Sequence, residues 1–157
     1  MSARARVEVA CLVPADALPG PEADVVALVE RAVAAAGLPG AVSVALVDDA
    51  RMREVNRDFH ACDEPTDVLA FALGAEGLPT PADAFDYELV VSVDTARREA
   101  EERGVTARAE LALYVVHGSL HLLGFDDHDA DDARRMHART REVLAGLGIE
   151  NTIEVES

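Results

Sequence analysis

Residues 106–123 read TARAELALYVVHGSLHLL, and we expect this stretch to form a helix inside the domain. The segment 111–116 (LALYVV) is apolar on every side of a helix, which is typical of a helix that is covered all round. Thr106 is a suitable N-terminal cap, because its hydroxyl can accept a hydrogen bond from the first turn. Gly124 is expected to end the helix, since glycine adopts the left-handed conformation at little cost. This buried helix is the predicted centre of the fold.

The segments before and after it alternate between strand-like and helix-like patterns. Alternating or short apolar runs predict strands at residues 6–13, 41–47, 68–73 and 88–93, and the run VLAFAL at 68–73 is typical of a central strand. Helical spacing and capping residues predict helices at 21–37, from 48 onward, at 94–104, and from 129 to Gly146 or Gly148. The pattern predicts an α/β (α+β) fold, with a mixed sheet of about four strands and packed helices around a central buried helix that carries HxxxH.

Three of the outer helices have a predicted inner face of apolar residues at helical spacing. In the helix at 21–37 this face is Val25, Leu28, Val29, Ala32, Val33 and Ala36. In the helix that Asp48 and Asp49 cap, it is Met52, Val55 and Phe59. In the last helix it is Met136, Thr140, Val143, Leu144 and Leu147.

Length and composition favour one soluble domain. The chain has 157 residues and half of them are hydrophobic, so we expect a single domain over residues 1–157 that buries about two thirds of its unfolded surface. No run of about 18 apolar residues occurs, and the N-terminus lacks a long apolar signal core, so we expect a cytoplasmic protein without a membrane partner. Cys11 and Cys62 are too few for a disulfide scaffold and are expected to be free thiols.

The charge balance argues against general nucleic-acid binding. Thirty acidic residues face fourteen basic ones, all of them arginine, for a net charge of −16. A protein that held nucleic acid mainly through its phosphates would carry a basic face, because counterion release supplies most of that affinity. We therefore expect no DNA partner. RNA binding would require a local site with a metal ion and a few arginines, or RNA already held by a larger particle.

Two histidines lie four residues apart in the central helix. His117 and His121 would project from one helix face about one turn apart, which is the spacing that a single metal ion requires. A catalytic zinc site has three protein ligands and keeps a fourth position for water. A histidine pair of this kind is, alone, more often packing than metal binding. Gly124 then lets the chain double back toward the pair, which favours His128 as the third ligand and predicts one zinc ion per chain.

Gly118 and the nearby acids refine this prediction. A glycine in mid-helix costs about 1 kcal/mol relative to alanine, so Gly118 indicates close backbone approach or space beside a ligand. Gly118 also stands where zinc peptidases with an HExxH helix have their catalytic glutamate, so a peptidase of that mechanism is disfavoured. The aspartates around residues 126–132 could orient the imidazoles, but an acidic first turn exposed to solvent is the commoner explanation.

The segment His117-Gly-Ser-Leu-His121-Leu-Leu-Gly-Phe-Asp126 resembles, nearly letter for letter, the HGxLHLxGYDH signature of the YbeY family. Residues 56–59 (NRDF) and 63–71 (DEPTDVLAF) are similar to a second stretch of that family, N-x-x-Y-R-x-x-D-x-P-T-D-V-L-S-F. Residues 88–92 (ELVVS) resemble a strand of the family, and Met136 matches a methionine usual in its last helix. The order and spacing hold over roughly residues 42–147.

The resemblance implies a small metal-dependent hydrolase domain with zinc on His117, His121 and His128. It implies a single-strand-specific endoribonuclease that acts in ribosomal RNA maturation, notably at the 3′ end of the small-subunit RNA. The implied partners are single-stranded RNA, ribosomal RNA or the small ribosomal subunit. The side chain that moves the proton is not indicated, so the catalytic residue stays unknown.

Three departures from the family pattern affect the site. Six residues separate His121 from His128 where the family has five, so Asp126 or Asp127 could compete for the third position; we favour His128, which keeps an imidazole ligand. His60 replaces an arginine of the family, which removes a phosphate contact. Arg57, one turn earlier, could supply this contact instead, although an exposed arginine more often has no such role. Tyr87 replaces a glycine, which could shift Glu88.

Two other functions stay open. The chain could be a non-catalytic zinc-binding ribosome assembly factor, in which a fourth protein ligand would close the metal site. It could also be a metal-dependent hydrolase of another substrate, which a narrow pocket would favour. His60 and His137 are expected to be solvated, and Thr66 and Asp67 are given no catalytic role because Pro-Thr-Asp is also ordinary turn chemistry.

Overall fold

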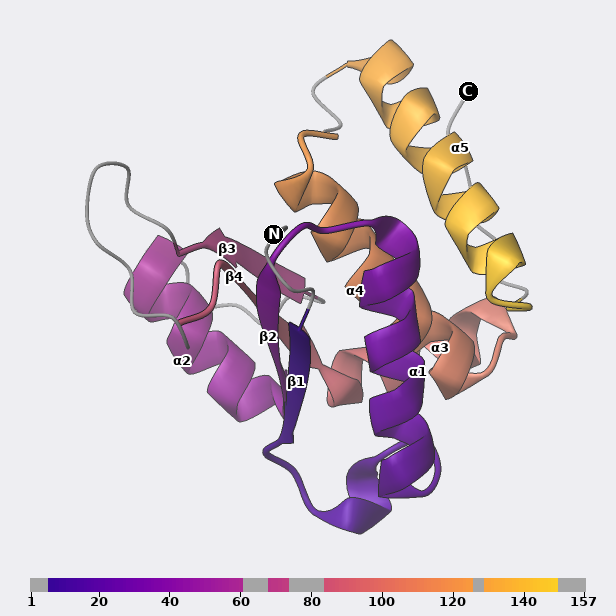
Figure 1. Ribbon diagram of the computed structural model, residues 1–157. Coiled ribbons are helices and arrows are strands. Elements are labelled where there is room, and N and C mark those ends of the chain that lie inside the picture. The colour runs from indigo at the N-terminus through magenta and orange to yellow at the C-terminus, as the bar shows by residue number, and fades with distance from the viewer. Residues whose placement is uncertain (1–5, 61–67, 74–83, 126–128, 150–157) are drawn as a thin grey trace.

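The computed structural model describes residues 6–60, 68–73, 84–125 and 129–149, without the side chains of residues 59 and 60. Figure 1 shows the elements, most of which begin and end within two residues of their predicted bounds. In chain order they are β1 (Arg6–Cys11), the 3-10 helix η1 (Ala15–Ala17), α1 (Glu22–Ala36), β2 (Ala41–Val47), α2 (Asp49–His60), β3 (Val68–Ala72), β4 (Tyr87–Ser92), α3 (Val93–Arg103), α4 (Ala107–Leu122) and α5 (Ala130–Gly146).

The strands of the described ranges form one mixed sheet in the order β1-β2-β4-β3. β2 runs parallel to both β1 and β4, and β3 runs antiparallel to β4. Parallel neighbours need a crossover connection, which α1 provides between β1 and β2. The predicted α/β fold with a four-stranded mixed sheet is confirmed.

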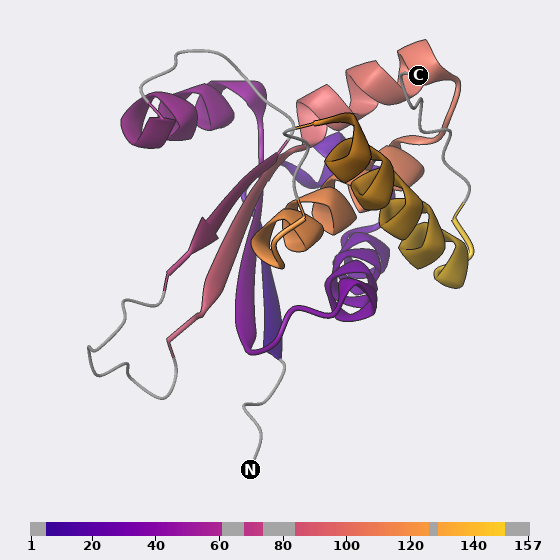
Figure 2. The ribbon, with the colours of Figure 1, turned by 90° about the horizontal axis from the view of Figure 1, so that it is seen from above.

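Helices cover the two faces of the sheet unequally. Figure 2 shows α2 alone on one side of the sheet and α1, α4 and α5 on the other. The main core lies on the second side, where α1 and α4 pack on the sheet and α5 packs on α1 and α4. A smaller cluster on the α2 side contains Val47, Met52, Leu69 and Val90. The main core is therefore buried by α4 and the helices next to it.

The predicted inner faces of the outer helices agree with the structure. All six apolar positions predicted for α1 are buried, and so are Met136, Thr140, Val143 and Leu144 of α5, while Leu147 is half-buried. In α2, Met52 is buried and Val55 is half-buried; the side chain of Phe59 lies outside the described residues. The 3.6-residue period of the sequence thus identified which side of each helix packs inward.

α4 occupies the centre of the domain, as predicted. It packs against α1, α3 and α5 as well as against β3 and β4. Leu111, Val115 and Leu120 on successive turns have no exposed surface. Although this helix is largely apolar, none in the described ranges is long and apolar enough to span a membrane. Its apolar surface is instead covered by the other helices and the sheet.

A buried ion pair joins the end of α3 to the start of α4. Only 2% of the Glu110 side chain is exposed, and Arg103 Nη1 donates to both of its carboxylate oxygens, at 2.6 and 2.9 Å. Between the two helices, Thr106 Oγ1 accepts a hydrogen bond from the backbone N–H of Ala109 at 3.0 Å, which confirms the predicted cap. A buried carboxylate without a partner would cost several kcal/mol. The pair therefore constrains the position of the end of α3 relative to the start of α4.

The prediction of a central strand at residues 68–73 was wrong. In the described part of the chain, β3 pairs only with β4 and forms an edge of the sheet. Its apolar composition has another cause, because both of its faces are covered. Val68 and Ala70 pack toward α4, whereas Leu69 and Phe71 pack on the α2 side. A fully apolar strand indicates two covered faces, and an edge strand between two helical layers satisfies that condition as well as a central one.

Gly118 is the point where α4 lies closest to the sheet. A Cβ atom at this position would lie 2.9 Å from Leu89 Cδ2 and 3.0 Å from Val68 Cγ2. Ordinary Cβ contacts are longer, so either neighbour would have to move. Of the two explanations that the sequence allowed for this glycine, close backbone approach is therefore the one that the packing supports.

The start of α3 is tied to the start of α2 through Asp49. Ser92 Oγ and Thr95 Oγ1 donate to Asp49 Oδ1 at 2.8 and 2.9 Å, and Arg98 Nη1 donates to Asp49 Oδ2. In the other direction, the backbone N–H of Asp49 donates to Asp94 Oδ2 at 2.9 Å. Ser92 caps α3 through the Thr95 N–H, and Asp94, where the predicted helix begins, bonds to the start of α2.

These contacts determine the protonation of Asp49. Desolvation by burial raises the pKa of its carboxyl group, but hydrogen bonds from Arg98, Ser92 and Thr95 and the charge of Arg98 outweigh that effect. The net result is a pKa below the usual value. The charged form of Asp49 therefore stabilises the folded state.

We predict that Gly118→Ala lowers the free energy of unfolding by about 1 kcal/mol. Overpacking a core contact costs roughly 1–3 kcal/mol, and the better helix propensity of alanine offsets about 1 kcal/mol of this. Gly146→Ala is a matched control, because no atom lies within 4 Å of its Cβ position, and it should raise stability by up to about 1 kcal/mol. Urea unfolding measures both; equal stabilisation by the two variants would contradict the close approach.

We predict that Asp49→Asn lowers the free energy of unfolding by about 1.5–3 kcal/mol at pH 7, the range for hydrogen bonds to a charged group. The folded-state pKa of Asp49 is lowered, so its stabilisation is complete above the unfolded pKa of about 3.9 and is lost as the pH falls through the folded value. The difference from wild type should therefore shrink below about pH 4. Asp48→Asn is the control, since Asn also caps helices and can accept the Arg51 N–H. A constant difference at every pH would contradict the role of the charge.

Candidate metal site

His117 and His121 lie in the second half of α4, on one flank of the helix. They are one turn apart, and the intervening residues Gly118, Ser119 and Leu120 are buried. Because Gly118 faces the sheet, its neighbour His117 points to the side of the helix, where it is half-buried, and His121 is exposed. Packing around α4 therefore holds two imidazoles on the same flank at the edge of the core.

The two imidazole rings are nearly parallel. Their centroids are 6.5 Å apart and their planes differ by 10°. To bind one zinc ion at about 2.0–2.1 Å, the rings would tilt toward each other by rotation of their side chains. The exposure of His121 leaves room for this rotation. The residue type, the shared flank and the partial access to solvent fit a zinc ion, and that these residues bind one stays a prediction.

Gly124 ends α4 just after His121, as the sequence predicted, whereas the predicted return of the chain toward the histidines lies largely outside the described residues. Gly124 has a φ of 103°, its N–H donates to the carbonyl of His121 at 3.1 Å, and the N–H of Phe125 donates to the carbonyl of Leu120 at 3.0 Å. This pair of bonds is the Schellman arrangement that ends a helix with a left-handed glycine. The turn directs the chain away from the α4 axis immediately after the second histidine.

The third ligand lies outside the described residues. His128 and its two competitors, Asp126 and Asp127, belong to residues 126–128, which the structure does not describe. Within the described ranges, no group of three His, Cys, Asp or Glu side chains gathers in a metal-binding arrangement. The assignment of His128 as the third ligand accordingly stays a prediction.

Other residues singled out in the sequence lie away from the histidine pair or outside the description. Glu88 alternates with Leu89 and so projects from the sheet face opposite α4. Arg57 on α2 is exposed and pairs with its neighbour Asp58 at 3.7 Å. Thr66, Asp67 and the side chain of His60 lie outside the described residues.

His137 and Cys11 also have defined surroundings. His137 on α5 is half-buried, and its Nδ1 atom is shielded from solvent, so the expectation of a solvated side chain was wrong. Cys11 is a free thiol, as predicted, whereas Cys62 lies outside the described residues. Burial and, secondarily, the charge of Glu22 raise the pKa of Cys11, which disfavours the nucleophilic thiolate.

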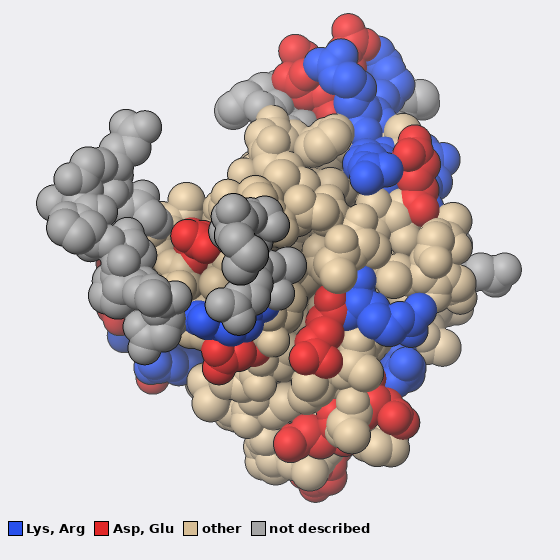
Figure 3. Space-filling model, in the orientation of Figure 1, with Lys and Arg blue, Asp and Glu red and all other residues tan. Residues whose placement is uncertain are grey.

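A small pocket begins two residues after His121. It has a volume of about 270 Å³, and we call it the Leu123 pocket; its lining residues are Leu123, Gly124, Phe125, Asp132 and Arg135. The sequence had not indicated Arg135 as a site residue. The sequence feature that could have indicated Arg135 is its position three residues after Asp132, because residues three apart lie on the same side of a helix. Figure 3 shows basic and acidic side chains together at the upper end of the molecule, where α5 lies.

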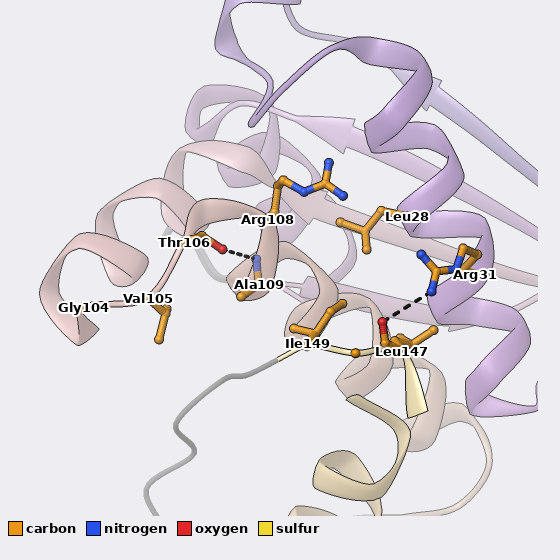
Figure 4. A pocket seen from close by; sticks show the side chains of 10 residues that line it. Leu28, Arg31, Gly104, Val105, Thr106, Arg108, Ala109, Leu147 and Ile149 are labelled. Atoms are coloured by element: carbon orange, nitrogen blue, oxygen red, sulfur yellow. Dashed lines mark hydrogen bonds between the residues drawn. The ribbon is translucent and has the colours of Figure 1, made fainter. Parts of the chain in front are cut away.

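A larger cavity lies at the other end of α4. Its volume is about 880 Å³, and Figure 4 shows it between α1, the turn from α3 to α4 and the segment after α5. Thr106 and Arg108 line it at the start of α4, and Arg31 lies across from them, where its Nη2 donates to the carbonyl of Leu147 at 3.3 Å. The ten residues from 107 to 117 span about 15 Å of helix, so this cavity is separate from the histidine pair.

Comparison with known proteins identifies the family. The family model described as "Endoribonuclease YbeY" matches residues 22–148 of the chain. A protein named endoribonuclease YbeY from Moorella thermoacetica is 44% identical over 130 residues, covering 78% of this chain and 83% of the relative. A relative of the same name from Halorhodospira halophila is 41% identical over 131 residues, covering 82% and 85% of the two chains.

A solved structure has the same fold. The solution structure of TM1509 from Thermotoga maritima is 25% identical in sequence, with a TM-score of 0.54 and coverage of 92% of both chains. The family match covers every element from α1 to α5, including the histidine-bearing α4, and it contains residues 42–147, over which the sequence resemblance holds. On these grounds the chain belongs to the YbeY family.

Proposed function

We propose that the chain is a zinc-dependent endoribonuclease that cuts single-stranded RNA during maturation of ribosomal RNA, at the 3′ end of the small-subunit RNA. The observation that carries this proposal is the pair His117 and His121 on one flank of a buried helix, followed at once by a glycine turn. The names of the curated relatives, endoribonuclease YbeY, support RNA as the substrate.

In this proposal the protein positions the metal ion and limits the access of water. α4 is buried over most of its length by packing against other helices and the sheet, so the backbone that carries both imidazoles does not need to be ordered by the metal. His117 is half-buried and His121 is exposed, which leaves one open side for RNA. With His128 they would hold a zinc ion, which supplies a Lewis acid for a phosphate oxygen and acidifies a water molecule. No proton-transfer residue is assigned.

The proposed partner explains how an acidic chain reaches RNA. With thirty acidic residues against fourteen arginines and a net charge of −16, the protein would be repelled by free RNA at long range. RNA already bound in the small ribosomal subunit would be delivered through contacts with that particle. We propose this subunit as the partner, a location in the cytoplasm, and no DNA or membrane partner.

We predict about one zinc ion per chain in the purified protein, measured by elemental analysis. His117→Ala, His121→Ala and His128→Ala should each lose the zinc ion and reduce cleavage of a single-stranded RNA by at least about 100-fold. The basis for this magnitude is that losing even an indirect partner of a metal ligand costs 10–100-fold. A chelator should abolish cleavage by wild type, and added zinc should restore it.

His137→Ala is the matched control, because this histidine lies on α5 outside the proposed ligand set, and it should keep both zinc and cleavage. Zinc retained in His128→Ala would move the third ligand to Asp126 or Asp127. Zinc bound with no cleavage of RNA by wild type would contradict the proposed activity and favour a zinc-binding assembly factor. Cleavage that persists in the metal-free protein would contradict metal dependence.

A further inference from the structure

The Leu123 pocket lies at the end of α4, next to the turn that follows His121 of the proposed metal site. The hydrogen bonds from Gly124 to His121 and from Phe125 to Leu120 join two of its walls directly to the helix turn that carries His121. Its other wall comes from the first two turns of α5. The pocket is therefore connected through the backbone to one of the two proposed metal ligands.

One wall of the pocket is apolar and accessible. Leu123 is 39% exposed, one of only three large hydrophobic side chains in the described ranges that are exposed to this degree. Phe125 is half-buried, with part of its surface against the main core. An exposed leucine next to an aromatic side chain is a suitable surface for an unstacked nucleobase, because aromatic stacking is the main sequence-independent contact with single strands.

The opposite wall carries a positive charge that is already oriented. Arg135 is 67% exposed, and its Nη2 donates to Asp132 Oδ1, so the carboxylate restricts the guanidinium to this side of α5. A guanidinium has five N–H donors, so the exposed Arg135 keeps donors beyond its bond to Asp132 that it can offer to an anion. Because an exposed ion pair at this spacing contributes at most about 1 kcal/mol, removing Arg135 should not unfold the protein.

We propose that the Leu123 pocket is a nucleotide subsite for single-stranded RNA. One unpaired base packs against Leu123 and Phe125, and Arg135 contacts the phosphate next to it. The volume of about 270 Å³ is just below the usual range for small-molecule sites, which suits a single nucleobase better than a base pair. This inference rests on the proposed function and gives a physical reason for a preference for single strands.

The test is binding of a fluorescein-labelled, phosphorothioate-linked uridine decamer to the full chain, measured by anisotropy between 25 and 200 mM NaCl. Arg135→Ala should weaken binding 3- to 10-fold at the lowest salt. It should also flatten the plot of log affinity against log salt by about 0.7, the value for one phosphate contact on a single strand. Arg135→Lys should keep the slope of wild type, because the charge remains.

Arg134→Ala is the matched control. Arg134 is the next residue on α5, is similarly exposed, and pairs with Asp131 in the same i,i+3 manner, but it does not line the pocket. It should leave the salt slope unchanged. Leu123→Ser tests the apolar wall and should weaken binding by a similar factor at every salt concentration, because no charge is lost. Thermal unfolding of each variant checks that the fold is intact.

The outcomes separate this inference from the proposed function. Equal salt slopes for Arg135→Ala and Arg134→Ala would overturn the subsite, because any effect would then be general electrostatics. RNA that wild type binds and cuts, with Arg135→Ala and Leu123→Ser unchanged, would overturn the subsite and leave the endoribonuclease intact. RNA that wild type neither binds nor cuts would overturn both.

Discussion

The close contact between α4 and the sheet at Gly118 is the constraint on which the rest of the structure depends. With no side chain there, α4 approaches Leu89 and Val68 closely enough to close the main core. The same contact determines the rotation of α4 about its axis, and therefore the flank on which His117 and His121 project. The packing of the core and the positions of the two histidines therefore depend on the same contact.

The two ends of α4 are held by different kinds of interaction. At its start, the buried pair of Glu110 with Arg103 couples the helix to α3, and an unpaired charge there would be costly. At its end, backbone hydrogen bonds around Gly124 complete the helix without any charged group. At this end of the domain, the ion pair of Arg135 with Asp132 belongs to α5 and lines the Leu123 pocket.

The acidic composition acts in two ways. Most arginines in the described ranges form ion pairs with acidic neighbours, so little positive charge is left for a broad nucleic-acid surface. Asp49 shows that an acidic residue can have a structural role, because its carboxylate joins the starts of α2 and α3. Arg135 differs from the other arginines in lining a pocket beside His121. RNA affinity in such a chain has to come from a few well-placed groups.

The elements, the buried helix, the family and the two histidines on one flank could be predicted from the sequence, because periodicity, caps and residue spacing are local properties. The sequence did not predict that the strand at 68–72 lies at the edge of the sheet, because an apolar run indicates that both faces of a strand are covered and does not indicate strand order. The bond of Asp94 to α2, the close contact at Gly118 and the place of Arg135 in a pocket depend on residues far apart in the chain. These features arise when separate elements pack together, so they belong to the tertiary structure.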